Sequence, residues 1–259
     1  MPSWNADQYL KFAAERTQPA RDLVARIALD GPRRVVDLGC GPGNSTALLA
    51  ARWPGADLVG LDSSMAMINQ ATHDHPEWRW VVGDIAEWAK EEADQFDLIF
   101  SNAAMQWVDD HETVYPALFR RVAPGGALAV QVPANLDAPA HTQMRELAST
   151  PAWASQLPHG GVREWYVHEP EFYYDLLAPH AARLDLWVTD YIHVMDGAAG
   201  IVEWYKGTGL RPFLDALPND GERENFLADY TDRIAEAYPA QPDGRVLFPF
   251  RRFFLVAYR

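Results

Sequence analysis

From residue 33 to residue 133, short apolar runs alternate with segments whose apolar residues recur at helical spacing. Runs that are apolar throughout predict strands buried on both faces, and strands separated by helices predict a parallel sheet. Right-handed crossovers make such a sheet doubly wound. The predicted strands are Arg33–Asp37, Asp57–Asp62, Arg79–Gly83, Asp97–Ser101 and Ala127–Val132, and the predicted helices are Asn44–Arg52, Ser64–His73, Ala86–Lys90 and His111–Val122.

Two further helices are predicted before this core. Asn5 has the side chain to cap a helix over Ala6–Glu15. Thr17 has the side chain to cap a second helix, with Pro19 in its first turn. One face of that second helix would carry Leu23, Val24, Ile27 and Ala28.

After Pro133 the pattern becomes irregular. Helices are predicted near Ala140–Ser149, over Glu169–Leu177 and within 197–240, and strands over Leu184–Val194 and Arg245–Tyr258. Pro249 indicates an edge or a bulge in the last strand, because proline cannot donate to a ladder. The two late strands predict an antiparallel pair added to the parallel sheet, and helical segments 134–165 and 197–242 predict a cap over one end of it.

A glycine-rich loop carries the strongest chemical signal. Gly39, Gly41 and Gly43 follow a predicted strand and open a predicted helix, the context that a nucleotide-binding loop needs. The spacing Gly-x-Gly-x-Gly differs from the Gly-x-Gly-x-x-Gly of dinucleotide folds, and Pro42 removes an amide that could hold a pyrophosphate.

Three successive strands end in an acidic residue: Asp37, Asp62 and Asp84. Asp62 stands 19 residues after Gly43, where a carboxylate can accept hydrogen bonds from ribose hydroxyls. A single such aspartate is more often a helix cap or turn former. Three in register with a glycine loop predict a ligand site at the carboxyl ends of the strands.

Composition and charge exclude several classes of protein and of binding partner. The 259 residues are 48% hydrophobic and 22% charged, which excludes disordered and fibrous proteins. The sequence holds no uncharged apolar run of about 18 residues, and its start lacks a signal-peptide pattern. With Cys40 as the single cysteine, we expect a cytoplasmic protein. The net charge of −14 argues against nucleic acid and anionic membranes as partners. The oligomeric state stays open, a monomer included.

Together these motifs resemble the class I S-adenosylmethionine-dependent methyltransferase family. The resemblance rests on Asp37-Leu38-Gly39-x-Gly41-x-Gly43, Asp62, Gly83-Asp84, Phe96–Ile99 and Pro124–Gly126. It implies a mostly parallel seven-stranded sheet with one antiparallel hairpin, an α/β Rossmann-like methyltransferase fold. Segments at Trp4–Pro19, Asn102–Trp107, Trp204–Pro212 and Phe248–Phe254 are similar to the narrower trans-aconitate 2-methyltransferase family. That similarity implies methyl ester formation on a small tricarboxylate.

The resemblance also implies roles for individual residues. The glycines would pass beneath the methionine part of the cofactor, Asp62 would hold its ribose, and Asn102 with Ala103 would contact its methionine end. Tyr9 and Arg16 would close over the site, although both could equally be helix-surface residues. The residues expected to bind S-adenosylmethionine are Tyr9, Arg16, Asp37, Gly39, Gly41, Gly43, Asp62, Ser63, Met67, Asp84, Ile85, Asn102 and Ala103.

An anionic substrate needs local cations in an acidic protein. Lys206 and Arg211 lie at a predicted loop-to-helix junction, and Arg251 and Arg252 alternate on the last strand, so at most one of that pair faces a site. Each cation alone is more often a solvated surface group. The residues expected to bind the substrate are Gln106, Trp107, His159, Tyr191, Tyr205, Lys206, Arg211 and Arg251.

A substrate carboxylate is ionised at neutral pH, so no catalytic acid or base is expected. Cys40, between two glycines, fits a space-filling role better than that of a nucleophile. His73 and His75 are two residues apart and do not predict a metal site.

Three alternatives stay open: methylation of another small acid or metabolite, a nicotinamide dehydrogenase, and a non-catalytic cofactor-binding protein. The segments expected are N-terminal helices closing over the cofactor site at 1–29, a cofactor-binding core at 30–133, cap segment 134–165, continued core at 166–196, helical cap segment 197–242 and a final core strand at 243–259.

Overall fold

The structure, a computed structural model, describes residues 13–91, 94–157 and 165–259, and within these the side chains from residue 17 onward. The predicted cap Asn5 and most of the predicted helix Ala6–Glu15 lie outside the described residues.

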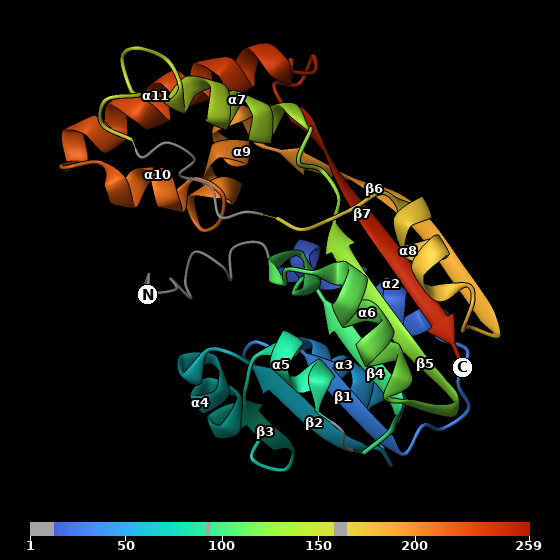
Figure 1. The fold of residues 1–259 in the computed structure, drawn as a ribbon. Coiled ribbons are helices and arrows are strands. Elements are labelled where there is room, and N and C mark those ends of the chain that lie inside the picture. Colours follow the sequence, from blue (N-terminus) through green and yellow to red (C-terminus); the bar gives the residue numbers. More distant parts are fainter. Residues whose placement is uncertain (1–12, 92–93, 158–164) are drawn as a thin grey trace. The chain divides into compact units, whose positions relative to one another are not determined.

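The chain forms a seven-stranded sheet with the strand order β3-β2-β1-β4-β5-β7-β6 (Figure 1). β1 pairs in parallel with β2 and β4, β2 with β3, and β4 with β5, whereas β5 and β7 run antiparallel. The order reverses between β1 and β4, so the carboxyl ends of these strands form the expected ligand crevice. The strands are β1 Arg34–Leu38, β2 Asp57–Asp62, β3 Arg79–Val82, β4 Phe96–Asn102, β5 Val122–Pro133, β6 Arg183–Met195 and β7 Val246–Tyr258. The predicted α/β class and the mostly parallel seven-stranded sheet are confirmed.

The residues divide into two compact units. The core unit comprises Arg16–Ala134, Trp165–Thr189 and Arg252–Arg259. The second unit, here called the helical unit, contains among its described residues 13–15, 135–157 and 190–251. The predicted segment boundaries remain predictions.

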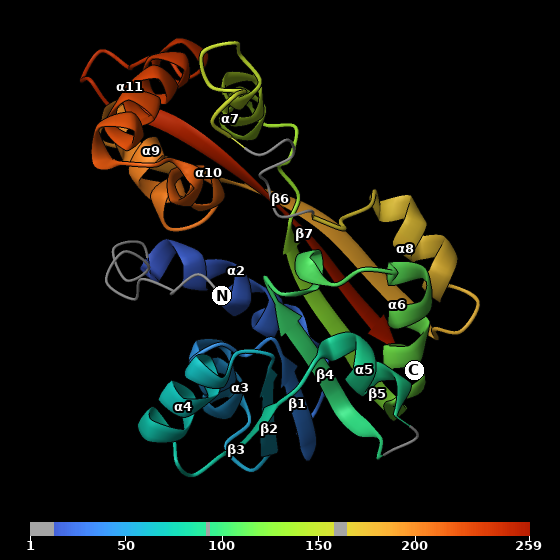
Figure 2. The same ribbon diagram turned by 60° about the vertical axis from the view of Figure 1, so that its left-hand side comes forward.

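Helices cover both faces of the sheet in the core unit (Figure 2). On one face, α5, α6 and α8 contribute Ile85, Leu118 and Tyr173 to a core shared with the inward residues of β1, β4 and β5. α3 and α4 lie on the other face, as right-handed crossovers require. These helices are α3 Asn44–Arg52, α4 Met65–Asp74, α5 Ile85–Lys90, α6 His111–Arg120 and α8 Pro170–Leu177.

Three predictions about element boundaries are wrong. The helix α2 runs from Ala13 to Arg26 without a break, so Thr17 does not begin a new helix. The Ala-Ala-Glu-Arg start favours helix strongly enough to tolerate Pro19 in the interior. Ala28 lies beyond the helix and is exposed. β5 begins at Val122 rather than Ala127 because the strand resumes its pairing with β4 after a register shift at the Pro-Gly-Gly turn.

The helical unit has its own apolar core. Trp204, Tyr205, Phe226, Tyr230 and Phe248 are buried together in it. Its helices, which lie together in Figure 1, are α7 Pro139–Ala148, α9 Gly197–Lys206, α10 Arg211–Ala216 and α11 Asp220–Ala237. None of the helices in the described ranges is both long and apolar enough to cross a membrane.

Pro249 occupies a position consistent with its prediction. The register between β5 and β7 ends where Pro133 pairs with Arg252, so Pro249 stands three residues outside that ladder. The missing N–H therefore costs the β5–β7 pairing nothing.

Candidate functional site

The glycine loop has the backbone shape that its sequence predicts. Gly39, Gly41 and Gly43 have φ of 73°, 54° and 97°, values that side-chain-bearing residues rarely adopt. A Cβ on Gly39 would lie 2.1 Å from the Cβ of Ala104, and one on Gly43 would lie 2.9 Å from the ring of Trp80. By contrast, no atom of the described residues lies within 4 Å of a Cβ built on Gly41. Within the described part of the chain, the loop is therefore closely packed at Gly39 and Gly43 and open at Gly41.

Asp37 supports this loop from beneath. Its carboxylate accepts hydrogen bonds from Ser45 Oγ at 2.6 Å and Thr46 Oγ1 at 2.7 Å, both at the start of α3. The side chain is 1% exposed. This burial raises the pKa of Asp37 to about 6, against the lowering effect of the two hydroxyl donors. Asp37 thus anchors the turn from β1 into α3.

Asp62 joins the end of β2 to the loop. One carboxylate oxygen accepts from the backbone N–H of Gly41 at 3.0 Å, and the other accepts from the N–H of Ser64 at 2.8 Å. The N–H of Gly39 also donates to the Leu61 carbonyl at 2.7 Å. Because a carboxylate offers about four lone-pair sites, Asp62 can still accept bonds from ribose hydroxyls.

The helices after β2 and β3 begin at this same edge of the sheet. Ser64 caps α4, while the neighbouring Ser63 is exposed and Met67 is half-buried. Asp84 caps α5 by accepting from the N–H groups of Ala86 and Glu87, and Ile85 is buried behind it. The helix-cap interpretation of Asp84 is thus confirmed at one oxygen.

The turn after β4 approaches the glycine loop. Asn102 pairs in register with Gln131 of β5, and its side-chain Oδ1 is buried with no hydrogen-bond partner among the described residues. Ala103 has a φ of 53°, which is uncommon outside glycine. Its N–H donates to the Gln131 carbonyl at 2.9 Å. Gly39 leaves the space that Ala104 fills.

A short helix, η1 Met105–Trp107, holds the next two predicted residues. Gln106 is buried, with its Nε2 donating to the Ala103 carbonyl at 2.7 Å, and Trp107 is half-buried with its ring against Trp165. His111 fixes this helix through its Nε2, which lies 2.9 Å from the Met105 carbonyl. A carbonyl only accepts, so Nε2 carries the proton and Nδ1 accepts from Tyr173.

The helical unit holds most of the predicted substrate residues. Arg211 begins α10 and lies 3.5 Å from Asp215, and Lys206 ends α9 at 3.1 Å from Glu203. Tyr205 is buried and accepts a 3.4 Å hydrogen bond from Asn135. The remaining members are Tyr191, which is half-buried on β6, and Arg251, which is exposed and paired with Asp190.

Arg251 and Arg252 behave as strand alternation predicts. Arg251 is exposed, whereas Arg252 is 7% exposed. Tyr9, His159 and the side chain of Arg16 lie outside the described residues, and their predicted roles remain predictions.

The sequence analysis did not predict several residues that support the glycine loop and the turn after β4. Ser45 and Thr46 hold Asp37, Trp80 packs against Gly43, and the Gln131 carbonyl holds Ala103. A hydroxyl pair directly after a glycine loop was a usable signal for the first two. The roles of Trp80 and Gln131 depend on strand order, which the sequence shows only indirectly.

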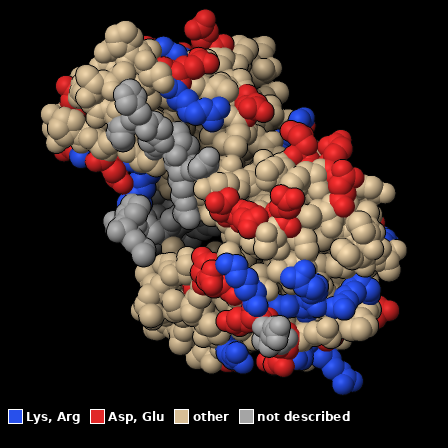
Figure 3. Space-filling view, viewed as in Figure 1, with Lys and Arg blue, Asp and Glu red and all other residues tan. Residues whose placement is uncertain are grey.

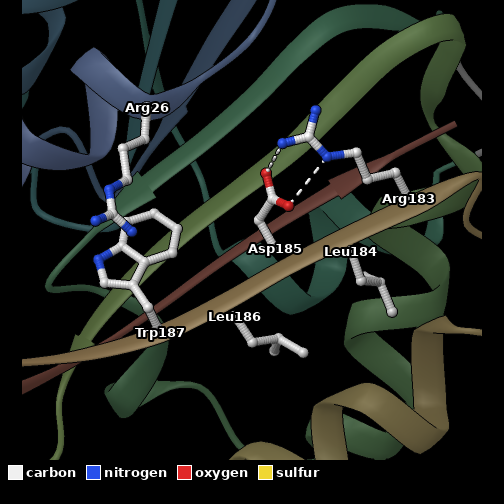
Figure 4. A pocket seen from close by; sticks show the side chains of 6 residues that line it. All are labelled: Arg26, Arg183, Leu184, Asp185, Leu186 and Trp187. Atoms are coloured by element: carbon white, nitrogen blue, oxygen red, sulfur yellow. Dashed lines mark hydrogen bonds and ion pairs between the residues drawn. The ribbon is translucent and has the colours of Figure 1, made fainter.

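A surface hollow of about 460 Å³ also lies in the core unit (Figure 4). The guanidinium of Arg26 lies 4.4 Å from the ring centre of Trp187, and Arg183 binds Asp185. Arg183 also lies over the ring of Tyr258, the last residue of β7. Five of its six lining residues belong to β6, the last strand in the sheet order, and none of the six belongs to the glycine loop.

Among the described residues, potential metal ligands are dispersed. Among the residues the structure describes, no group of three or more His, Cys, Asp or Glu side chains is arranged to hold a metal ion. On the described part of the face in Figure 3, several basic side chains lie together in the lower half of the view, and acidic side chains lie beside and above them.

The residues at the strand ends fit a nucleoside cofactor. Three features lie at the carboxyl ends of β1, β2 and β4: the space at Gly41, the remaining lone pairs of Asp62 and the buried Oδ1 of Asn102. Among the described residues, no atom fills that space and none forms a hydrogen bond with that Oδ1. A glycine loop without Cβ atoms lets a ligand approach the backbone closely.

Comparison with known proteins agrees with this geometry. Residues 35–126 match the family model described as a methyltransferase domain. The chain is 54% identical to the trans-aconitate 2-methyltransferase of Azoarcus sp. (strain BH72), covering 100% of both chains. It is 51% identical to that of Rhodopseudomonas palustris (strain BisB18), covering 99% of both.

Solved structures support the fold. The YcgJ protein from Bacillus subtilis aligns with a TM-score of 0.60 at 13% identity, covering 93% of this chain and 98% of that one. The phosphoethanolamine N-methyltransferase 2 of Haemonchus contortus aligns with a TM-score of 0.55 at 15% identity, covering 93% and 52%. Because curated relatives at about 50% identity over the full chain are methyltransferases, the nicotinamide dehydrogenase alternative is wrong. Full-length identity near 50%, together with the methyltransferase domain, shows that the chain belongs to the trans-aconitate 2-methyltransferase family of S-adenosylmethionine-dependent methyltransferases.

Proposed function

We propose that this enzyme transfers a methyl group from S-adenosylmethionine to one carboxylate of trans-aconitate, forming the methyl ester. The observation that carries the proposal is the extent of the similarity. Identity of 54% with a trans-aconitate 2-methyltransferase spans the helical unit as well as the glycine loop. Substrate choice in a shared cofactor fold depends on the parts outside the cofactor core.

The residues of the chain bind the cofactor and orient it toward the substrate carboxylate. When bound, S-adenosylmethionine supplies an electrophilic methyl group, which an ionised carboxylate oxygen accepts as the carbon–sulfur bond breaks and its electron pair returns to sulfur. Asp62 and the glycine loop hold the nucleoside, and Asn102 with Ala103 holds the methionine end. Alignment of this kind contributes ~7–11 kcal/mol in favourable cases.

This reaction needs no proton acceptor, because the substrate carboxylate is already ionised. His111, the histidine bonded to η1, has both ring nitrogens engaged. Burial also lowers its pKa, which keeps the ring neutral. His111 therefore holds η1 in place and takes no part in proton transfer.

The remaining carboxylates of the substrate need cations or hydrogen-bond donors. We assign this role to Arg211, whose guanidinium is partly buried in the helical unit, with Lys206, Tyr191 and Tyr205 as further candidates. Trp107 would line the pocket of the methyl acceptor, trans-aconitate. Arg251 is the weaker candidate, because both its Nε and an Nη already bind Asp190.

A labelled-methyl assay tests the proposal. S-adenosylhomocysteine binding is first measured by calorimetry, and methyl transfer is then compared for trans-aconitate, cis-aconitate, isocitrate and citrate. We expect the highest kcat/KM with trans-aconitate and a base-labile methyl ester as product. Faster transfer to another acid would overturn the substrate assignment. Tight cofactor binding without transfer to any acid would favour a non-catalytic protein.

A further inference from the structure

We propose that Gln106 is a positioning residue for the cofactor, which clamps the turn after β4 in a strained shape and does not contact the substrate. This proposal rests on the assignment of Asn102 and Ala103 to the methionine end of the cofactor. The turn in question runs from Asn102 to Ala104, with Ala103 at its centre.

Ala103 adopts a conformation that its side chain disfavours. Its φ of 53° lies in the left-handed region, where a Cβ crowds the backbone. Such a residue persists only where the surrounding structure over-determines it, and strained residues of this kind cluster at ligand sites. The contacts that hold Ala103 are therefore candidates for a functional role.

Two hydrogen bonds hold Ala103, one through its backbone N–H and one through its carbonyl. The N–H of Ala103 donates to the Gln131 carbonyl at 2.9 Å, which continues the ladder between β4 and β5. The carbonyl of Ala103 accepts from Nε2 of Gln106 at 2.7 Å. The first bond belongs to the sheet, and the second comes from a side chain placed three residues later. Gln106 is thus the part of the clamp that a substitution can remove.

Gln106 is itself held rigidly. Its own carbonyl accepts from the N–H of Tyr166 at 3.0 Å, and the preceding carbonyl, of Met105, is bonded to His111. The side chain is 3% exposed. A fixed donor on a fixed backbone can hold Ala103 in one geometry.

The chemistry of the side chain supports the same conclusion. Its Oε1 is buried and has no partner among the described residues. A methionine would fill a similar volume without burying an unpaired oxygen. The amide side chain therefore acts through its Nε2, which donates to the Ala103 carbonyl. This burial also separates Gln106 from Trp107, which is half-buried and remains the residue assigned to the acceptor.

The turn must hold its shape because it meets the glycine loop. The Cβ of Ala104 occupies the space that a side chain on Gly39 would take, 2.1 Å from where the Cβ of that side chain would stand. Movement at Ala103 therefore shifts Asn102 and disturbs the packing beneath Gly39. The expected consequence is weaker cofactor binding, even in the absence of an acid acceptor.

Calorimetry with S-adenosylhomocysteine alone tests this inference. We expect Gln106→Met to weaken affinity about three- to tenfold, the range expected for one lost hydrogen bond. The KM for trans-aconitate at saturating cofactor should stay within about twofold. Adding Ala103→Gly should restore most of the affinity, because glycine adopts a positive φ without the clamp. Gln143→Met, which removes an amide on α7, serves as the matched control and should bind normally.

Thermal melting identifies any variant that fails to fold, and only folded variants are compared. Unchanged affinity for S-adenosylhomocysteine with a raised KM for the acid would make Gln106 a substrate contact and overturn the proposal. Weakened affinity without rescue by Ala103→Gly would also overturn it. If the wild-type protein binds S-adenosylhomocysteine but methylates no acid, the proposed substrate fails while this test stays decisive.

Discussion

The carboxylate of Asp62 accepts a hydrogen bond from the backbone N–H of Gly41 at 3.0 Å. The bond ties the last residue of β2 to the middle of the glycine loop. The second carboxylate oxygen of Asp62 accepts a hydrogen bond from the N–H of Ser64, which begins the turn into α4. One side chain thus sets the loop shape and also faces the predicted ribose position.

Substituting Asp62 should therefore weaken cofactor binding through two effects at once. We expect Asp62→Ala to lower the affinity for S-adenosylhomocysteine by about 1.5–3 kcal/mol, since hydrogen bonds to a charged group are lost. Calorimetry provides the measurement. Asp57→Ala, at the exposed opposite end of β2, is the matched control and should bind normally. Equal affinities for the two variants would remove Asp62 from the site.

Gly39 should tolerate substitution poorly, for a reason distinct from ligand contact. A methyl group there would stand 2.1 Å from the Cβ of Ala104, and the residue has a φ of 73°. We expect Gly39→Ala to cost about 1–3 kcal/mol of stability through overpacking and strain. Urea denaturation gives the value.

Substitutions at two other glycines distinguish the effect of overpacking from the effect of backbone strain. Gly41 has a φ of 54°, but no described atom lies within 4 Å of a Cβ built on it, so Gly41→Ala should cost only the backbone strain, about 1 kcal/mol of stability. Gly55 has neither feature, and Gly55→Ala should be neutral. A loss for Gly39→Ala no larger than that for Gly41→Ala would show that the contact with Ala104 relaxes freely.

Much of the core could be predicted from the sequence because its signals are local. The apolar runs matched β2 at both ends, and the glycine loop was placed correctly before α3. Residues such as Asp62 follow from counting along the chain. The prediction at Thr17 is wrong because it gives a capping residue and a proline more weight than the helical tendency of the alanines before them, whereas in the structure the helix continues through both.

The supporting contacts could not be predicted in the same way. Gln131 reaches Ala103 only because β5 pairs with β4, and Trp80 reaches Gly43 only because β3 lies beside β2. Neither contact follows from spacing along the chain. The sequence predicts Asp37 at the ligand, whereas in the structure its carboxylate is buried and accepts hydrogen bonds from the hydroxyls of Ser45 and Thr46.

Buried Asp37 should make stability depend on pH. Burial raises its pKa from 3.8 to about 6, so folding favours its protonated form. The stabilisation is fully present below pH 3.8 and is lost as the pH rises through 6. Relative to Asp37→Asn, the wild-type protein should lose about 2 kcal/mol of unfolding free energy between about pH 4 and about pH 7. Urea titrations at several pH values measure this difference, and parallel profiles for the two proteins would contradict it.

Arg211 should affect the acid substrate and leave the cofactor unaffected. It begins α10 in the helical unit, where its guanidinium lies 3.5 Å from Asp215 and is partly buried. A charge-assisted bond to a substrate carboxylate is worth about 1.5–3 kcal/mol, so Arg211→Ala should raise the KM for trans-aconitate by about ten- to a hundredfold. Steady-state kinetics at saturating cofactor measure it. Arg233→Ala removes another cation of the same unit, one bonded to Gln143, and should leave the KM unchanged. An unaltered KM for Arg211→Ala would take Arg211 out of the substrate site, whereas equal increases in both variants would point to the net charge of the helical unit.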